Sequence, residues 1–138
     1  MENITVSHTK TDEFSPLTLA FVGDGVYDLL VREYLVRKAN RPVGELNKIK
    51  VSLVNCKSQA EFAKQIMPSL TEKELSVYKR GRNATTSCTP KNSTKAEYHS
   101  ATGLEALFGY IYLKGDVNRI KELFSVVLGN IDAKKDEV

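Results

Sequence analysis

Cysteine is scarce in this chain, and long hydrophobic runs are absent. Cys56 and Cys88 are the only cysteines among 138 residues, and neither belongs to a CxxC or Cys/His motif. This usage argues against a disulfide framework and against a zinc site, so we expect two free thiols. No stretch approaches the roughly 20 apolar residues of a membrane span. The first fourteen residues also lack the apolar core of a secretory signal. We therefore expect a cytoplasmic protein without a membrane partner.

Strand patterns are missing as well. No run alternates apolar and polar residues, and no turn dipeptide joins two such runs. The apolar content of 41% and the charged content of 27% are those of an ordinary globular protein. At 138 residues the chain has room for one domain. The sequence therefore predicts a single all-α domain.

Helix signals divide the chain into six segments. Ser15 and Pro16 are typical of a helix start, and the helix that follows should run to about Ala39. Its apolar residues cover nearly every face, which predicts a central position in the fold. Further helices are expected over about 45–54, 58–67, 71–79 and 98–113, and from Asp116 onward. We expect the folded domain to span 15–131, between a flexible segment (1–14) and a fraying polar tail (132–138).

Two of these apolar helices each contain a carboxylate without a nearby cation. On a helix, side chains three or four residues apart are neighbours, and none of these positions around Asp24 or Glu105 holds Lys or Arg. Both acids lie in apolar stripes that we expect the fold to bury, and each then costs several kcal/mol unless a positive group reaches it. A metal ion shared by the two would supply that charge. The alternative is tight helix packing, with each acid satisfied by a buried Arg or Tyr.

Glycines surround both acids. Gly23 and Gly25 flank Asp24, and Gly103 and Gly109 lie on either side of Glu105. A glycine inside a helix costs about 1 kcal/mol relative to alanine. The pattern therefore indicates that another helix or a ligand approaches the backbone closely.

Three other polar residues carry weaker signals. Asp28 has Arg32 four residues later, in the order that favours a structural ion pair on a helix. His8 and His99 belong to no metal or catalytic motif. For His99 a surface or capping role is favoured over catalysis, and its function stays open.

Positive charge is concentrated between residues 79 and 97, where five cations accompany a single acid. Interleaved glycine, asparagine and hydroxyl residues predict a basic loop. Arginine, lysine and asparagine side chains bind phosphate oxygens, and the lack of aromatic residues between them favours a duplex over single-stranded bases. A merely solvated surface is the alternative. The candidate nucleic-acid contacts are Lys79, Arg80, Arg82, Asn83, Lys91 and Lys95.

Four ordered motifs resemble those of the Mini-III ribonucleases, the compact bacterial relatives of ribonuclease III. They are LAFVGDGVYDLLV, SLVNCKSQAEFAKQI, YKRGRNATTSCTPKN and YHSATGLEALFGYIYL, and the resemblance covers about residues 17–113. It implies a helical ribonuclease III catalytic-domain fold, a homodimer, and no separate domain for binding double-stranded RNA.

The same resemblance assigns the two acids. Asp24 matches the aspartate of the family's GD signature, and Glu105 matches the glutamate of its FEAL-type motif. Both are implied to be catalytic and to bind Mg²⁺, or alternatively Mn²⁺. Fuller relatives carry further acids where this chain has Ala20 and Thr102. A reduced metal site is therefore expected.

The implied activity is endonucleolytic cleavage of double-stranded RNA. The implied substrate is the precursor stem that flanks the large-subunit (23S) ribosomal RNA, with a large-subunit ribosomal protein as a further partner. Two alternatives stay open at this point. One is a noncatalytic helical dimer that binds structured RNA, and the other is a purely protein-binding domain.

Overall fold

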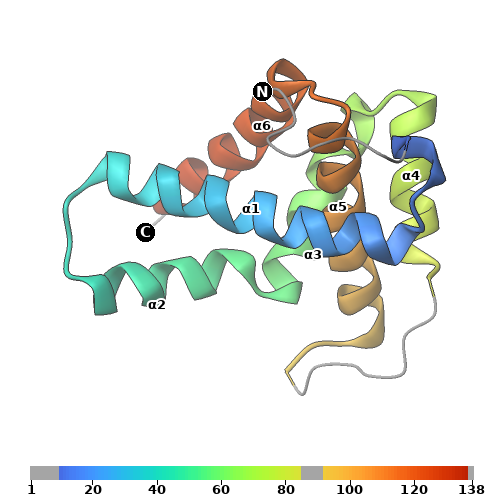
Figure 1. Cartoon of the computed structure of the whole chain (residues 1–138). Coiled ribbons are helices and arrows are strands. Elements are labelled where there is room, and N and C mark those ends of the chain that lie inside the picture. The colour runs from blue at the N-terminus through green and yellow to red at the C-terminus, as the bar shows by residue number, and fades with distance from the viewer. Residues whose placement is uncertain (1–9, 85–91, 137–138) are drawn as a thin grey trace.

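All regular structure in the described part of the chain is helical (Figure 1). The computed structural model describes residues 10–84 and 92–136, with side chains up to residue 132. No strand occurs in these residues, so the all-α prediction is confirmed. The helices are α1 (Pro16–Lys38), α2 (Val43–Val54), α3 (Cys56–Ile66), α4 (Glu72–Arg82), α5 (Lys95–Leu113) and α6 (Val117–Asp136), with short 3-10 turns η1 (Thr11–Glu13) and η2 (Met67–Ser69).

Local capping signals account for several helix starts. The Ser15 side chain accepts a hydrogen bond from the Thr18 amide at 3.2 Å, so α1 begins where the sequence predicts. Thr71 and Glu74 form the predicted reciprocal capping box of α4. At α6, the Asp116 carboxylate accepts from the Arg119 amide at 3.1 Å. The starts of these helices are therefore explained by capping hydrogen bonds within the first turn.

Two helix boundaries differ from the prediction in the basic region. α4 continues through Arg82 instead of ending near Lys79, so its last cations are helical and do not belong to a loop. α5 begins at Lys95 instead of near Tyr98, because Thr94 and Glu97 form a second capping box. The prediction of one continuous basic loop is therefore wrong for the described residues at both of its ends.

The last helix also extends further than expected. α6 runs to Asp136, past the expected end of the domain. Asp132, expected in the fraying tail, accepts hydrogen bonds from the Tyr34 hydroxyl at 2.6 Å and from Lys38 Nζ at 2.8 Å. These bonds attach the end of α6 to the C-terminal half of α1.

The central helix is α5 and not α1, which corrects the prediction. Ten of the nineteen residues of α5 are buried, and α1, α3, α4 and α6 pack around it (Figure 1). Helix α1 packs on α5 along one face only. Its other face leaves large apolar side chains in solvent, with 83% of Phe21 and 62% of Leu29 exposed. An all-round apolar helix therefore has a second surface that the single chain does not cover.

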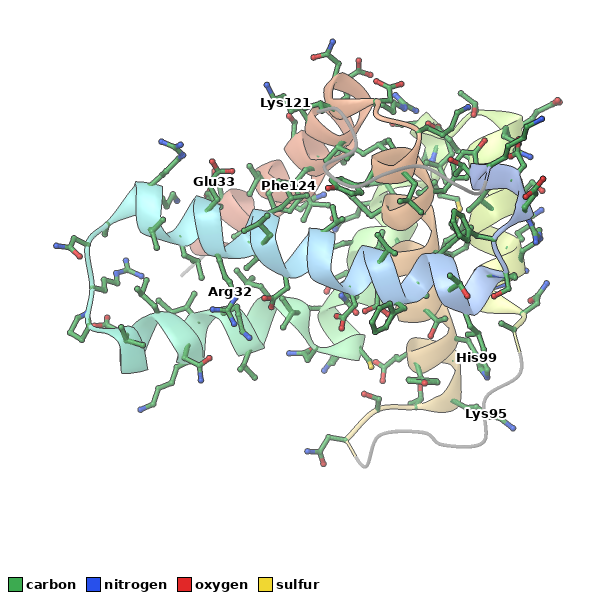
Figure 2. All side chains as sticks on the ribbon, in the orientation of Figure 1. Arg32, Glu33, Lys95, His99, Lys121 and Phe124 are labelled. Carbon is green, nitrogen blue, oxygen red and sulfur yellow. The ribbon has the colours of Figure 1, made fainter. Side chains whose placement is uncertain are left out.

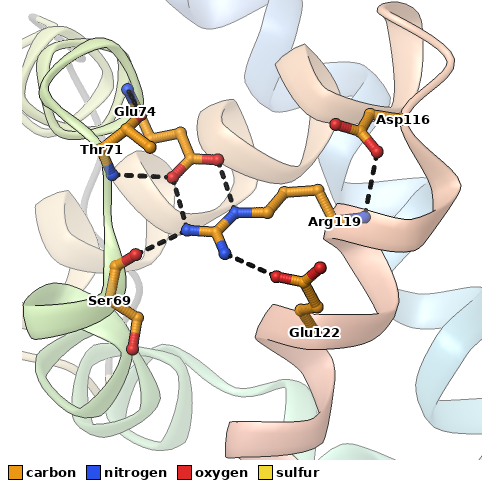
Figure 3. Close-up of polar contacts among 6 residues, drawn as sticks. All are labelled: Ser69, Thr71, Glu74, Asp116, Arg119 and Glu122. Carbon is orange, nitrogen blue, oxygen red and sulfur yellow. Dashed lines mark hydrogen bonds and ion pairs between the residues drawn. The ribbon is translucent and has the colours of Figure 1, made fainter.

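Arg119 connects three parts of the fold away from α1 (Figure 3). Its guanidinium donates to both carboxylate oxygens of Glu74 at 2.8 Å, to the Ser69 carbonyl at 2.6 Å and to Glu122 at 2.9 Å. Glu74 also accepts from the Thr71 amide at 2.9 Å. Only 10% of the Glu74 side chain is exposed. The cluster joins α6 to the start of α4 and to η2.

Membrane-spanning helices and free cysteines are two further points of comparison with the sequence. Within residues 10–84 and 92–136, no helix combines the length and apolar character needed to cross a bilayer. Cys56 is a free thiol. Cys88 and His8 lie outside the described residues.

Candidate active site

The candidate site is built where the backbones of α1 and α5 meet. A Cβ atom on Gly23 would lie 1.6 Å from the carbonyl oxygen of Glu105, and one on Gly109 would lie 2.0 Å from that of Leu19. No side chain fits in such a space. The two glycines therefore let the helices touch, and this contact brings residue 24 of α1 beside residue 105 of α5.

Asp24 and Glu105 form a carboxylate pair with unequal environments. Asp24 is exposed and Glu105 is half-buried. The expectation that both acids are buried is therefore wrong for Asp24, which lies on the outward face of α1. Burial, together with hydrogen bonding to Asp24 and its negative charge, raises the pKa of Glu105 to about 8. A carboxyl group with a raised pKa beside a second carboxylate is typical of a site that lacks a positive group.

The other two glycines near the acids, Gly103 and Gly25, have different surroundings. Gly103 makes room for α4, since a Cβ there would lie 2.8 Å from the Tyr78 ring. A Cβ on Gly25 would have no neighbouring atom within 4 Å. The close approach predicted for these glycines is therefore correct for Gly23, Gly103 and Gly109, and wrong for Gly25 within the chain.

Asp28 is a structural acid, as its spacing predicts. It pairs with Arg32 on α1 and with Lys50 on α2, the second at 3.3 Å. Partial burial alone would raise its pKa, but the hydrogen bonds from Arg32 and Lys50 hold the pKa below its usual value. Asp28 therefore has the cations that the Asp24–Glu105 pair lacks.

Tyr27 is a supporting residue that the sequence analysis missed. Its ring is fully buried and makes edge contacts with Phe108 and Phe124, at centroid distances of 5.8 and 6.1 Å. Its hydroxyl donates to the Leu53 carbonyl at 3.4 Å. Burial, and then the charge of Glu105, raise the pKa of Tyr27. Tyr27 thus stays neutral and connects the C-terminal end of α2 to the site. No local sequence signal distinguishes it from an ordinary core aromatic.

The two positions that lack acids are occupied by small residues. Ala20 is buried, and the Thr102 hydroxyl donates to the Tyr98 carbonyl at 3.0 Å within α5. Among the described residues, no third His, Cys, Asp or Glu joins the two carboxylates. Two hard oxygen donors fit Mg²⁺, which keeps several waters and commonly binds one or two carboxylates plus substrate phosphate. A cation there would offset the burial and the repulsion from Asp24 that together raise the Glu105 pKa.

Cations of the α4 C-terminus lie against the same stretch of α5. A Cβ on Gly81 would meet the Thr102 carbonyl at 3.2 Å, so the last turn of α4 packs beside the segment that precedes Glu105. Lys79 and Arg80 are exposed there. Arg82 is half-buried over the Tyr78 ring at 5.8 Å and donates to Asn83 at 3.2 Å.

The two remaining candidate contacts to nucleic acid are Lys91 and Lys95. Lys95 is exposed on the first turn of α5, and Figure 2 shows it near His99 at the N-terminal end of that helix. Lys91 lies outside the described residues. The described cations of α4 and α5 therefore lie along the N-terminal half of α5, the half that ends near Glu105.

A prominent groove of the surface lies elsewhere. It has a volume of about 490 Å³ and runs between α1 and α6, with Glu33, Lys121 and Phe124 among its lining residues (Figure 2). Asp24 and Glu105 do not line it. An open carboxylate pair beside exposed cations suits a polymeric substrate better than an enclosed small molecule.

Comparison with known proteins identifies the class first. The ribonuclease III domain family matches residues 17–116, which include both carboxylates and the cations around them. A crystal structure of a Fusobacterium nucleatum protein has the same fold, with a TM-score of 0.78 and 34% identity over 86% of this chain and 94% of that one. The chain belongs to the ribonuclease III family.

Curated relatives then narrow the family to one group. A Mini-ribonuclease 3 of Thermoanaerobacter is 45% identical over 81% of this chain and 79% of its own length. Those of Symbiobacterium thermophilum and Staphylococcus aureus are 40% and 33% identical, over 85% and 93% of this chain and 90% and 96% of their own lengths. The chain is a ribonuclease III-type endoribonuclease of the Mini-ribonuclease 3 group, as the sequence motifs predict.

Proposed function

We propose that this protein is a magnesium-dependent endoribonuclease specific for double-stranded RNA, with Asp24 and Glu105 as its metal ligands. The observation that carries the proposal is the contact of these two carboxylates across the α1–α5 glycine interface, without a neutralising side chain. Mn²⁺ has the same preference for hard oxygen donors and is expected to substitute. When bound, the metal supplies Lewis-acid chemistry, because it activates water and stabilises negative charge on the phosphate.

The protein's own residues position the substrate around that centre. Asp24 presents a carboxylate to solvent, where an RNA phosphate can reach it, while half-buried Glu105 is held in place by α5. Tyr27 keeps the helix junction behind Glu105 packed and neutral. Lys79, Arg80, Arg82, Asn83, Lys91 and Lys95 bind the RNA backbone. Duplex RNA is recognised mainly through its shape and backbone, which suits contacts of this kind.

We further propose that the active form is a homodimer. The face of α1 that includes Asp24 leaves Leu17, Phe21 and Leu29 exposed, and a large exposed apolar patch indicates a protein partner. A second copy of α1 would cover these side chains, and the proposed site requires that it leave Asp24 open to RNA. Each subunit would then cut one strand of the duplex and leave a short 3′ overhang.

The biological substrate that we propose is the double-stranded precursor stem flanking 23S ribosomal RNA, cut in the cytoplasm with a large-subunit ribosomal protein present. Support for this part comes from the motif resemblance and from the Mini-ribonuclease 3 names of the relatives. The described surface adds the phosphate-binding cations that any duplex substrate needs.

Three substitutions test the site. Asp24→Asn and Glu105→Gln should each lower the cleavage of a duplex RNA in Mg²⁺ by on the order of a hundredfold or more, because each removes a ligand charge. Asp28→Asn is the matched control, since this acid lies one turn away on α1 and is paired with Arg32 and Lys50. It should retain cleavage.

Binding of the same duplex separates catalysis from recognition. We expect the Asp24 and Glu105 variants to fold and to bind duplex RNA in a fluorescence anisotropy titration. Undiminished cleavage by either variant would show that the site is wrongly assigned. A wild-type protein that binds but never cuts, in Mg²⁺ or Mn²⁺, would point instead to a noncatalytic RNA-binding dimer.

A further inference from the structure

His99 has an unusual environment that the Asp24–Glu105 site does not explain. Its Nδ1 atom is buried and has no hydrogen-bond partner among the described residues. The ring packs edge-on against Tyr98, with centroids 5.9 Å apart and planes at 65°. The residue as a whole is only half-buried, and its Nε2 is neither buried nor bonded within the described part of the chain. Nδ1 is therefore enclosed by the protein, and Nε2 is the ring nitrogen left for a partner from outside.

This arrangement decides which nitrogen can act as a donor. A neutral imidazole has one N–H, and the hydrogen bonds of the ring determine which nitrogen carries it. A hydrogen on the buried Nδ1 would be a donor without an acceptor, and buried N–H groups are very rarely left in that state. The neutral ring therefore carries its hydrogen on Nε2. The N–H of Nε2 is thus available for an acceptor that the described residues do not supply.

The position of His99 connects this donor to the RNA-binding side of α5. Lys95 lies one turn before it, and the two side chains lie near each other at the N-terminal end of the helix (Figure 2). Glu105 lies six residues after His99, about 9 Å along the axis. The last turn of α4, with its exposed Arg80, packs beside Thr102 between these two levels. Along α5, His99 therefore lies between Lys95 and the level of the carboxylates.

We propose that His99 is a substrate-binding residue, which donates a hydrogen bond from Nε2 to a backbone phosphate of the RNA beside the cleavage site. This inference rests on the proposed function. A phosphate is the expected acceptor because Lys95 and Arg80 make the surroundings cationic, and most protein contacts to nucleic-acid backbones are made to phosphate oxygens. The ring packing against Tyr98 holds the donor in one orientation, so little freedom is lost when RNA binds.

Two amide substitutions separate the ring nitrogens. A glutamine side chain places its NH₂ group near the position of imidazole Nε2, whereas asparagine reaches only the position of Nδ1. We expect His99→Asn to weaken duplex RNA binding by about tenfold or more, the usual effect of losing a hydrogen bond to a charged group. His99→Gln should stay within about threefold of the wild type. His99→Phe keeps a ring against Tyr98 without a donor and should match the asparagine variant.

The dissociation constant of a short RNA duplex should be measured in a Glu105→Gln background, which prevents cleavage. In the otherwise wild-type enzyme, the Asn and Phe variants should raise KM and leave kcat nearly unchanged. Far-UV circular dichroism and thermal unfolding check the fold of each variant, and the Phe variant provides the comparison if the Asn variant is unstable.

The outcomes distinguish this inference from the proposed function. Wild-type binding by both the Asn and Phe variants, or equal losses in the Asn and Gln variants, would overturn the role of Nε2 while duplex cleavage by the wild type stands. A wild type that neither binds nor cuts duplex RNA would overturn the proposed function, and the role of His99 with it.

Discussion

Acidic side chains in this protein differ most in the partners that the fold gives them. Asp28 has Arg32 and Lys50, whereas Glu105 has Asp24 as its charged neighbour, and the pKa values of Asp28 and Glu105 move in opposite directions. Glu74 resembles Asp28, because it too is paired with a cation. The hydrogen bonds from Arg119 hold its pKa below the usual value of 4.5, although partial burial opposes them. Asp28 and Glu74 are thus paired with cations of the fold, whereas the Asp24–Glu105 couple is the metal site of our proposal.

The pair of Glu74 and Arg119 predicts a pH dependence of stability. A carboxyl whose pKa is lower in the folded than in the unfolded state contributes stability above the unfolded pKa, and this contribution is lost as pH falls through the folded pKa. We therefore expect Glu74→Gln to lower the free energy of unfolding by about 3 kcal/mol at pH 7, because it leaves Arg119 largely buried without its main partner. The deficit should shrink as pH falls below 4.5.

Urea unfolding between pH 7 and pH 3 measures this effect. Glu122→Gln is the matched control, since Glu122 also bonds Arg119 but 65% of its side chain is exposed. It should cost less than about 1 kcal/mol. A deficit of the Glu74 variant that does not change with pH would show that the ion pair is not its cause.

Among the helices, the contact of α1 with α5 matters most for the site. It depends on backbone atoms and not on side-chain packing, because Gly23 and Gly109 leave no room for a Cβ. Helices held this closely cannot shift without moving the carboxylates. The same contact therefore stabilises the fold and positions the proposed site.

Alanine substitutions test this contact between elements. Gly23→Ala should lower the free energy of unfolding by about 3 kcal/mol or more, since the new methyl group would overlap the Glu105 carbonyl. It should also lower cleavage, because Glu105 must move. Gly129→Ala on α6 meets nothing within 4 Å and should stabilise by up to about 1 kcal/mol. Urea unfolding of the two variants makes the comparison, and equal effects would contradict the close contact.

In the whole molecule, the two faces of α1 have different surroundings. One face of α1 builds the core, and the other exposes Leu17, Phe21, Leu29 and Val36 beside Asp24. Full exposure of a phenylalanine in water is unfavourable, by roughly 1.5–3 kcal/mol relative to burial. In the proposed homodimer, a second copy of the chain covers this face.

Sedimentation velocity can test the dimer. The wild type should sediment as a dimer at micromolar concentration, and Phe21→Asp should sediment as a folded monomer, because 83% of Phe21 is exposed and its loss spares the core. Ser125→Asp, on an exposed position of α6, adds the same charge away from this face and should stay dimeric. A wild type that remains monomeric would leave the α1 face for a different partner.

Local signals in the sequence were sufficient to predict most helices, but not to predict how these helices pack. Ser15, Thr71 with Glu74, and Asp116 act on amides within one turn, so they predict helix starts. Thr94 and Glu97 form the same capping box and could have located the start of α5. Gly81 in the basic stretch favours a loop by propensity, yet α4 continues because Gly81 packs against α5.

The sequence by itself determined the helical class and the family motifs, and it singled out Asp24 and Glu105 as candidates, because these depend on residue types and short spacings. Only the tertiary structure decided which helix is central, that Asp24 is open while Glu105 is half-buried, and that one nitrogen of His99 is buried without a partner among the described residues. Each of these depends on atoms distant in the chain. Burial and close contact are set by how helices pack, and helical periodicity alone does not specify which faces meet.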